Sequence, residues 1–94
     1  MSAAETLRLR ITGKVQGVGY RLWAARNAAN LGLRGWVRNR HDSSVEMLVT
    51  GASEGVAAMV EAARKGPAGA RVAEVTATPD ADDGSVGCTA LPTE

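Results

Sequence analysis

A short segment with two glycines and an arginine is the part of this chain whose residue types best suit chemistry. It reads Val15-Gln16-Gly17-Val18-Gly19-Tyr20-Arg21, and it joins an alternating strand pattern to a helical one. Backbone N–H groups at the start of a helix have no partner inside the helix, and the helix dipole adds positive potential there. Glycine lets the backbone approach a ligand closely, and arginine offers a charged planar group that matches phosphate oxygens. The segment therefore predicts an anion site, although a plain turn with a solvated arginine has the same local sequence.

The elements that must position this segment follow from the spacing of apolar residues. Alternation of apolar and polar residues predicts strands over 7–12, 33–40, 45–50 and 71–78, with a short edge strand over 86–90. Helical spacing predicts one helix over 20–31 and a second that begins with Ser53 as its N-cap. Val72 and Val75 break the period of two, which indicates a β-bulge in the fourth strand.

The order of these elements is β-α-β-β-α-β, which is the ferredoxin-like, or split β-α-β, arrangement. We expect an α+β sandwich in which an antiparallel sheet carries two helices on one face. The length of 94 residues favours one domain over 1–94, with its core over about 6–91.

Composition excludes several classes of function. The net charge of +1 is too balanced to indicate nucleic-acid binding by charge alone. Cys88 and His41 are the only residues of their types, so neither an internal disulfide nor a site rich in cysteine or histidine is available. We therefore expect no cofactor and no metal. The first residues lack the pattern of a signal peptide, and the chain has no apolar run of membrane-spanning length. A soluble, cytoplasmic protein is the expectation.

Two motifs in the chain resemble those of the acylphosphatase family. Gly13-Lys14-Val15-Gln16-Gly17-Val18-Gly19-Tyr20-Arg21 resembles the first motif of that family. Gly35-Trp36-Val37-Arg38-Asn39, followed by Asp42 and then Val45-Glu46, resembles the second. The resemblance spans residues 6 to about 79, and its parts come in the family's order. It implies a monomeric enzyme of ferredoxin-like fold that hydrolyses the carboxyl–phosphate bond of small acyl phosphates and releases inorganic phosphate.

The resemblance also implies a role for particular residues. Arg21 would bind the substrate phosphate, and Asn39 would hold the attacking water. A cradle for the phosphate would come from the backbone N–H groups of Gln16, Gly17, Val18, Gly19, Tyr20 and Arg21. Phosphoryl transfer depends mainly on positioning and charge stabilisation. A carboxylate leaving group, with a pKa of about 4 to 5 by analogy with side-chain carboxyls, needs no general acid. A chain with one histidine could therefore catalyse this reaction.

Three alternatives stay open at this stage. Asn39 could simply end a strand and satisfy the next turn. The domain could be a non-catalytic anion-binding module, since the same domain type occurs fused to carbamoyl-transfer maturation proteins. Trp36 lies between Arg34 and Arg38, and a basic, aromatic sheet face is typical of RNA-binding domains with this topology. The central strands lack the several aromatic residues that such domains use, so we expect no nucleic-acid partner.

The chain departs from the family pattern at two positions near the predicted site. Ser43 stands where the family usually has glycine in a hairpin turn. If Ser43 adopts a left-handed conformation, the cost is roughly 1–2 kcal/mol relative to glycine, unless Asp42 takes that conformation instead. Gly19 stands where the family often has a bulkier residue, and we expect it to make the loop more flexible when no anion is bound.

Overall fold

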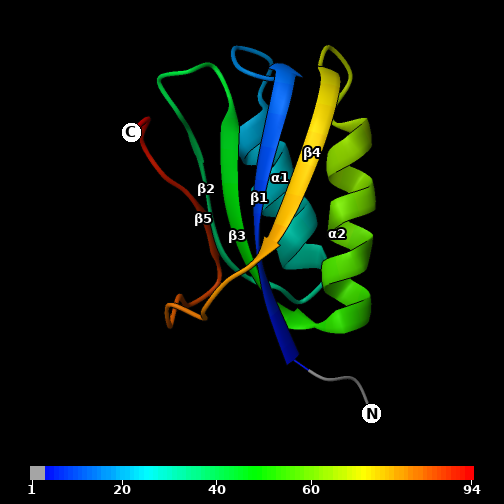
Figure 1. Cartoon of the computed structure of the whole chain (residues 1–94), viewed down its shortest axis with the longest axis vertical. Helices are drawn as coiled ribbons and strands as arrows, with labels where there is room; N and C mark the ends of the chain where they lie inside the picture. Colours follow the sequence, from blue (N-terminus) through cyan, green and yellow to red (C-terminus); the bar gives the residue numbers. More distant parts are fainter. Residues whose placement is uncertain (1–3) are drawn as a thin grey trace.

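The structure is a computed structural model that describes residues 4–94. In Figure 1, α1 lies behind a twisted sheet and α2 lies beside β4, and the β1–α1 loop and the β2–β3 turn lie at the same end of the sheet. The elements, in chain order, are β1 (Ala4–Lys14), α1 (Tyr20–Asn30), β2 (Arg34–Asn39), β3 (Val45–Ala52), α2 (Ser53–Lys65), β4 (Arg71–Pro79) and β5 (Cys88–Ala90).

The sheet has the strand order β4-β1-β3-β2-β5. β1 pairs with β3 and β4, and β2 pairs with β3, all in antiparallel fashion. The ferredoxin-like α+β fold is therefore confirmed, with both helices on one face of the sheet. The four strands of that arrangement pair antiparallel as expected, and the short edge strand β5 adds a parallel pair with β2, which makes the whole sheet mixed. The long connection from β4 crosses the sheet, so that β5 runs in the same direction as β2. The alternation of residues within β5 could not predict this direction.

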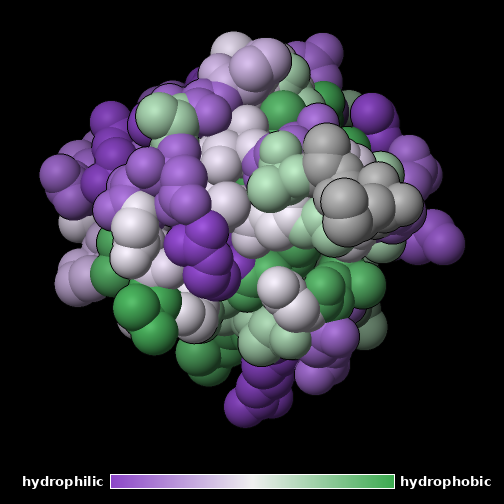
Figure 2. Space-filling view, turned by 90° about the horizontal axis from the view of Figure 1, so that it is seen from below, coloured by the Kyte–Doolittle hydropathy of each residue, from purple (hydrophilic) through white to green (hydrophobic). Residues whose placement is uncertain are grey.

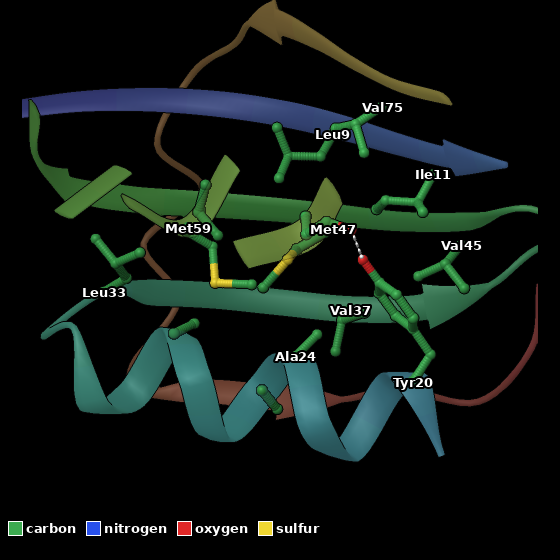
Figure 3. Close-up of a cluster of buried hydrophobic side chains, with 14 of the residues drawn as sticks. Leu9, Ile11, Tyr20, Ala24, Leu33, Val37, Val45, Met47, Met59 and Val75 are labelled. Carbon is green, nitrogen blue, oxygen red and sulfur yellow. Dashed lines mark hydrogen bonds between the residues drawn. The ribbon is translucent and has the colours of Figure 1, made fainter. Parts of the chain in front are cut away.

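The hydrophobic core fills the space between the sheet and the two helices (Figure 3). Alternate residues of the central strands point into it, as the period of two predicts. Leu9 and Ile11 from β1, Val37 from β2 and Met47 from β3 are fully buried. α1 packs through small residues, which bring the helix close to the sheet and so fix the direction in which its first turn points.

Tyr20 is the largest fully buried side chain among the described residues, and it joins the two helices. Its hydroxyl donates a hydrogen bond to the carbonyl oxygen of Ala63 in α2 at 2.7 Å (Figure 3). The carbonyl of Ala63 would normally accept from the residue four positions later, but that residue is Pro67, which has no N–H. Burial raises the pKa of the Tyr20 hydroxyl, which therefore stays protonated as the donor.

Three local predictions can be compared with the structure. The bulge in the fourth strand is confirmed, because the register between β1 and β4 shifts opposite Thr12 and Gly13. Of Ser43 and Asp42, the two residues left open for the left-handed conformation, Ser43 adopts it, with φ at 77°. Ser53, predicted as the N-cap of α2, is instead its first residue, and the extended Ala52 precedes it as N-cap. Helix ends shift by one residue in this way because the flanking residue needs only a non-helical backbone conformation.

The outer face of the sheet carries basic and aromatic side chains, but in the fold these side chains are paired with acidic residues. Arg38 stacks over the Trp36 ring at 4.6 Å and forms an ion pair with Glu46. The acidic loop after β4 crosses this face, where Asp82 pairs with Arg34 and Asp83 accepts a hydrogen bond from the Trp36 indole. Among residues 4–94, no helix is long and apolar enough to cross a membrane.

Candidate active site

The loop between β1 and α1 has the backbone conformation of an anion cradle. Gly17 and Gly19 both lie in the left-handed region, with φ at 75° and 77°. A Cβ atom added at either position would meet nothing within 4 Å. The glycines are therefore required for the backbone conformation and not for space, because an L residue in this region costs roughly 1–2 kcal/mol.

The first turn of α1 presents unpaired backbone donors to the same space. Gly19 is the N-cap residue, and no side chain caps this end of the helix. The helix hydrogen bonds begin with the N–H of Trp23, which donates to the carbonyl of Gly19 at 3.1 Å. The first turn holds no acidic residue, so the positive end of the helix dipole is not neutralised locally. This geometry favours a negatively charged ligand at the helix N-terminus.

A cavity of about 170 Å³ opens between this loop and the end of β2. Its lining residues come from the loop, the first turn of α1 and the last position of β2: Val15, Gln16, Gly17, Gly19, Tyr20, Arg21, Leu22 and Asn39. Arg21 is the only charged residue among them, and none is acidic. The cavity is smaller than the 300–1,000 Å³ typical of pockets for drug-sized ligands. The cavity therefore has a size that suits a small anion, and the remainder of a larger ligand would lie outside the cavity.

The Arg21 guanidinium is held from the far end of the chain. Its Nη1 donates a hydrogen bond to the backbone carbonyl of Leu91 at 2.6 Å. No ion pair joins Arg21 to an acidic residue within the described part of the chain. A neutral carbonyl orients the guanidinium without cancelling its charge. Arg21 therefore keeps its full positive charge and its other donors for an anion in the cavity.

Asn39 contributes an unsatisfied polar atom to the same cavity. It is the last residue of β2, and its Oδ1 atom is buried without a hydrogen-bond partner among the described residues. A buried acceptor left unpaired typically costs about 1–3 kcal/mol, so it calls for a functional or structural reason. The backbone of Asn39 is held independently, since its carbonyl accepts a hydrogen bond from the N–H of Glu94 at 3.0 Å.

The side chain of Gln16 connects the loop to the turn that follows Asn39. Its Nε2 donates to the backbone carbonyls of Arg40 at 2.8 Å and of Ser44 at 2.9 Å. The sequence interpretation named Gln16 only as a backbone donor and so missed this contact. The signal was weak, because both acceptors are main-chain atoms more than twenty residues away. Gln16 therefore links the Arg21 side of the cavity to the Asn39 side.

The turn after Asn39 is held by Asp42. Its Oδ1 accepts hydrogen bonds from the Ser44 hydroxyl at 2.5 Å and from the Ser44 backbone N–H at 2.9 Å. Its Oδ2 pairs with Arg10 of β1 at 2.9 Å. The Ser44 hydroxyl, the Arg10 guanidinium and the Ser44 N–H together hold the pKa of the Asp42 carboxyl well below its usual range. Asp42 is therefore ionised at neutral pH and fixes the turn in which Ser43 is strained.

The structure brings most of the predicted site residues together. Gln16, Gly17, Gly19, Tyr20, Arg21 and Asn39 all line one cavity. Val18 is not among its lining residues, because its side chain packs against the hydrophobic core. His41, which could have been considered as a base, lies exposed in the turn and does not line the cavity either. Leu22 also lines the cavity and was not singled out from the sequence, because it reads there as an ordinary helical leucine.

A larger hollow of about 340 Å³ lies on the outer face of the sheet. Three arginines line it, but each is already close to a carboxylate: Arg8 and Arg40 to Glu46, and Arg10 to Asp42. Burial alone would raise the pKa of Glu46, but hydrogen bonds from Arg38 and Arg8 outweigh this and lower it. Each arginine of the hollow is thus paired with a carboxylate, whereas Arg21 of the smaller cavity has no ion pair within residues 4–94.

The fold and the cavity together define a class of protein. It is a small ferredoxin-like α+β domain in which a helix N-terminus, a glycine loop and an arginine line one small cavity. A family model described as acylphosphatase matches residues 7–87. The acylphosphatase of Rhizobium etli is 52% identical to this chain over 71 residues, which cover 76% of each chain. The crystal structure of the acylphosphatase from Bacillus subtilis is 30% identical, has a TM-score of 0.89, and covers 95% of this chain and 99% of that chain.

The chain therefore belongs to the acylphosphatase family, and it is an enzyme that hydrolyses acyl phosphates. The prediction drawn from the two motifs is confirmed at this level. A crystal structure of full-length HypF, in its phosphate- and nucleotide-bound form, also matches with a TM-score of 0.89. It is 20% identical and covers 99% of this chain but 12% of the HypF chain, so this likeness concerns the fold alone.

Proposed function

We propose that the chain hydrolyses acyl phosphates by direct attack of water on phosphorus, with Arg21 and the loop holding the phosphate and Asn39 holding the water. The observation that carries this proposal is the cavity itself, which is lined by a guanidinium, helix N–H groups and an amide oxygen that lack ionic or hydrogen-bond partners of their own within residues 4–94, apart from the Leu91 carbonyl bound to Arg21. Each of these groups supplies something that phosphoryl transfer requires, namely charge stabilisation or positioning of the nucleophile.

The phosphate is bound by charge and by backbone donors. The N–H groups of the loop from Gln16 to Arg21 and the Arg21 guanidinium face the equatorial oxygens, on which negative charge is spread in the transition state. The loop is anchored at both ends, since β1 and α1 pack into the core. Once an anion has ordered the loop, little further reorganisation is needed when charge moves during the reaction.

Asn39 acts by orientation and not by proton abstraction. An amide cannot serve as a base at neutral pH, but its oxygen can accept a hydrogen bond from a water molecule. Attack of that water on phosphorus breaks the bond to the acyl oxygen, which leaves as a carboxylate, and the water's proton passes to a phosphate oxygen. The products are a carboxylate and inorganic phosphate. The leaving carboxylate has a pKa of about 4 to 5, so no general acid is needed.

Site variants test this assignment with benzoyl phosphate as substrate. We expect Arg21→Lys and Asn39→Ala each to lower kcat/KM by about 10² to 10³, the usual cost of losing one positioned contact. Lysine keeps the charge of Arg21 but not its two-pronged geometry. Arg26→Lys and Asn30→Ala, at exposed positions of α1, are the matched controls and should keep wild-type activity. Activity near that of the wild type in Arg21→Lys or Asn39→Ala would refute the assignment of that residue.

The wild-type chain also tests the alternative function, an anion-binding module that binds phosphate but does not hydrolyse acyl phosphates. Titration of the wild-type chain with inorganic phosphate, followed by the benzoyl phosphate assay, measures binding and turnover independently. Binding with no hydrolysis would favour the module. A pH–rate profile that required an enzyme base near neutrality would contradict proton transfer to the phosphate. The monomeric state, the cytoplasmic location, the extent of the single domain and the lack of a nucleic-acid partner stay predictions.

A further inference from the structure

We infer that the side chain of Leu22 forms the contact surface for the acyl group, and that it favours acyl phosphates with an apolar acyl group larger than acetyl. This inference rests on the proposed function of the same cavity. Its starting point is the small volume of that cavity, about 170 Å³, which is less than a typical pocket for a drug-sized ligand. A phosphate bound to the loop and Arg21 leaves little room, so a larger acyl group must extend past the rim.

Leu22 is the apolar side chain available at that rim. Three large hydrophobic residues are exposed among the described residues, namely Leu22, Leu31 and Val86, and only Leu22 lines the cavity. It is 59% exposed, whereas the other apolar lining residues, Val15 and Tyr20, are 1% and 2% exposed and already packed in the core. Leu22 can therefore still lose water-accessible apolar surface when a ligand binds.

The position of Leu22 ties this surface to the reacting group. It follows Arg21 directly in the first turn of α1, where the uncapped N–H groups lie. A phosphate held by those groups places the bond to be broken within reach of the first helical turn. Exposure alone does not make such a surface: hydrophobic residues are also exposed at the opposite end of the molecule (Figure 2). What distinguishes Leu22 is that it shares a wall of the cavity with Arg21.

The expected effect is a change in substrate preference. Covering part of one leucine side chain corresponds to roughly a three- to tenfold change in kcat/KM. An acetyl group has a single methyl group to cover Leu22, whereas a benzoyl group has a whole ring. The preference for benzoyl over acetyl phosphate should therefore depend on Leu22, and it should act mainly through KM, since the contact forms in the bound substrate as well as in the transition state.

The test measures kcat and KM of the full chain with benzoyl phosphate and with acetyl phosphate. We expect Leu22→Ala to lower the ratio of the two kcat/KM values three- to tenfold, mainly by raising KM for benzoyl phosphate, and Leu22→Met to restore most of it. Alanine is a good helix former, so α1 should persist. Leu31→Ala, the same change at the other end of α1, is the control and should leave the ratio unchanged.

The outcomes separate this inference from the proposed function. If the wild-type chain hydrolyses both substrates and Leu22→Ala leaves their ratio unchanged, the acyl-contact role of Leu22 is wrong while the hydrolytic function stands. The same holds if Leu31→Ala lowers the ratio as much as Leu22→Ala does. If the wild-type chain hydrolyses neither substrate, the proposed function fails first and the inference fails with it.

Discussion

At the scale of single residues, Gln16 shows how a side chain can act on a site without contributing charge. It joins the loop that precedes Arg21 to the turn that follows Asn39 through two hydrogen bonds of 2.8 and 2.9 Å. Both acceptors are backbone carbonyls, so their positions depend on the fold and not on their side chains. We therefore expect the distance between Arg21 and Asn39 to depend on this amide.

Replacement of Gln16 by methionine should affect both stability and activity. Methionine has a similar length but no donor, so two hydrogen bonds are lost, and the free energy of unfolding should fall by about 1–3 kcal/mol. A small displacement of Asn39 relative to Arg21 should lower kcat/KM about ten- to hundredfold. Urea unfolding and benzoyl phosphate kinetics measure the two effects separately.

Asn27→Met is the matched control for this change. The Asn27 amide donates to the carbonyl of Trp23 within α1 at 3.0 Å, so its loss removes a hydrogen bond without touching the two motif loops. The control should alter stability alone. Full activity in Gln16→Met would show that the loop and the turn hold their spacing without this side chain.

At the scale of elements, the turn between β2 and β3 combines strain with strong local bonding. Ser43 has φ at 77°. Its neighbour Asp42 accepts two hydrogen bonds from Ser44 and forms an ion pair with Arg10. These contacts of Asp42 hold the turn in the shape that strains its neighbour. The sequence left open whether Ser43 or Asp42 adopts the left-handed conformation; the structure assigns it to Ser43, where a glycine would have no Cβ to clash.

Ser43→Gly should therefore stabilise the protein slightly. Relief of the left-handed conformation is worth roughly 1–2 kcal/mol, and the extra freedom of glycine in the unfolded chain offsets roughly 0.4–1 kcal/mol of this. The net gain in the free energy of unfolding should be about 1 kcal/mol or less, measurable by urea denaturation. A lower midpoint with an unchanged m-value would show that the strain is not released by glycine.

At the scale of the whole molecule, Tyr20 connects α1, in the first half of the chain, to α2, in the second half. This residue starts α1 beside the cavity, while its hydroxyl reaches the C-terminal turn of α2. It supplies the donor that Pro67 cannot supply to the carbonyl of Ala63. The first turn of α1 is thus anchored from the far side of the core, which keeps the N–H groups of the cavity in place.

Tyr20→Phe removes this anchor while it keeps the ring. The carbonyl of Ala63 is left buried without a partner, so we expect the free energy of unfolding to fall by about 1–3 kcal/mol. For a domain of this size each kcal/mol corresponds to roughly 4–8 °C in Tm, which calorimetry resolves. An unchanged Tm would mean that water or a small backbone shift satisfies this carbonyl equally well.

Local sequence was sufficient for the features that depend on neighbours in the chain. The glycines of the loop, the period of two in β1 and β3, and the strained turn are each visible within about ten residues, because backbone sterics and side-chain alternation act over that range. The two motifs also singled out Arg21 and Asn39, which line one cavity in the structure, while their roles in catalysis stay predictions. The family assignment followed from the same two segments.

Contacts between distant segments were decided only by the tertiary structure. The carbonyl of Leu91 that orients Arg21, the backbone acceptors of Gln16 and the parallel pairing of β5 with β2 all join residues that lie far apart in the chain. Most of these contacts use main-chain atoms, which every residue has, so no residue type marks them in advance. The exposure of Leu22 beside the cavity likewise depends on what the rest of the chain leaves uncovered. The sequence alone thus predicted which groups bind phosphate, and packing decided how those groups face one another.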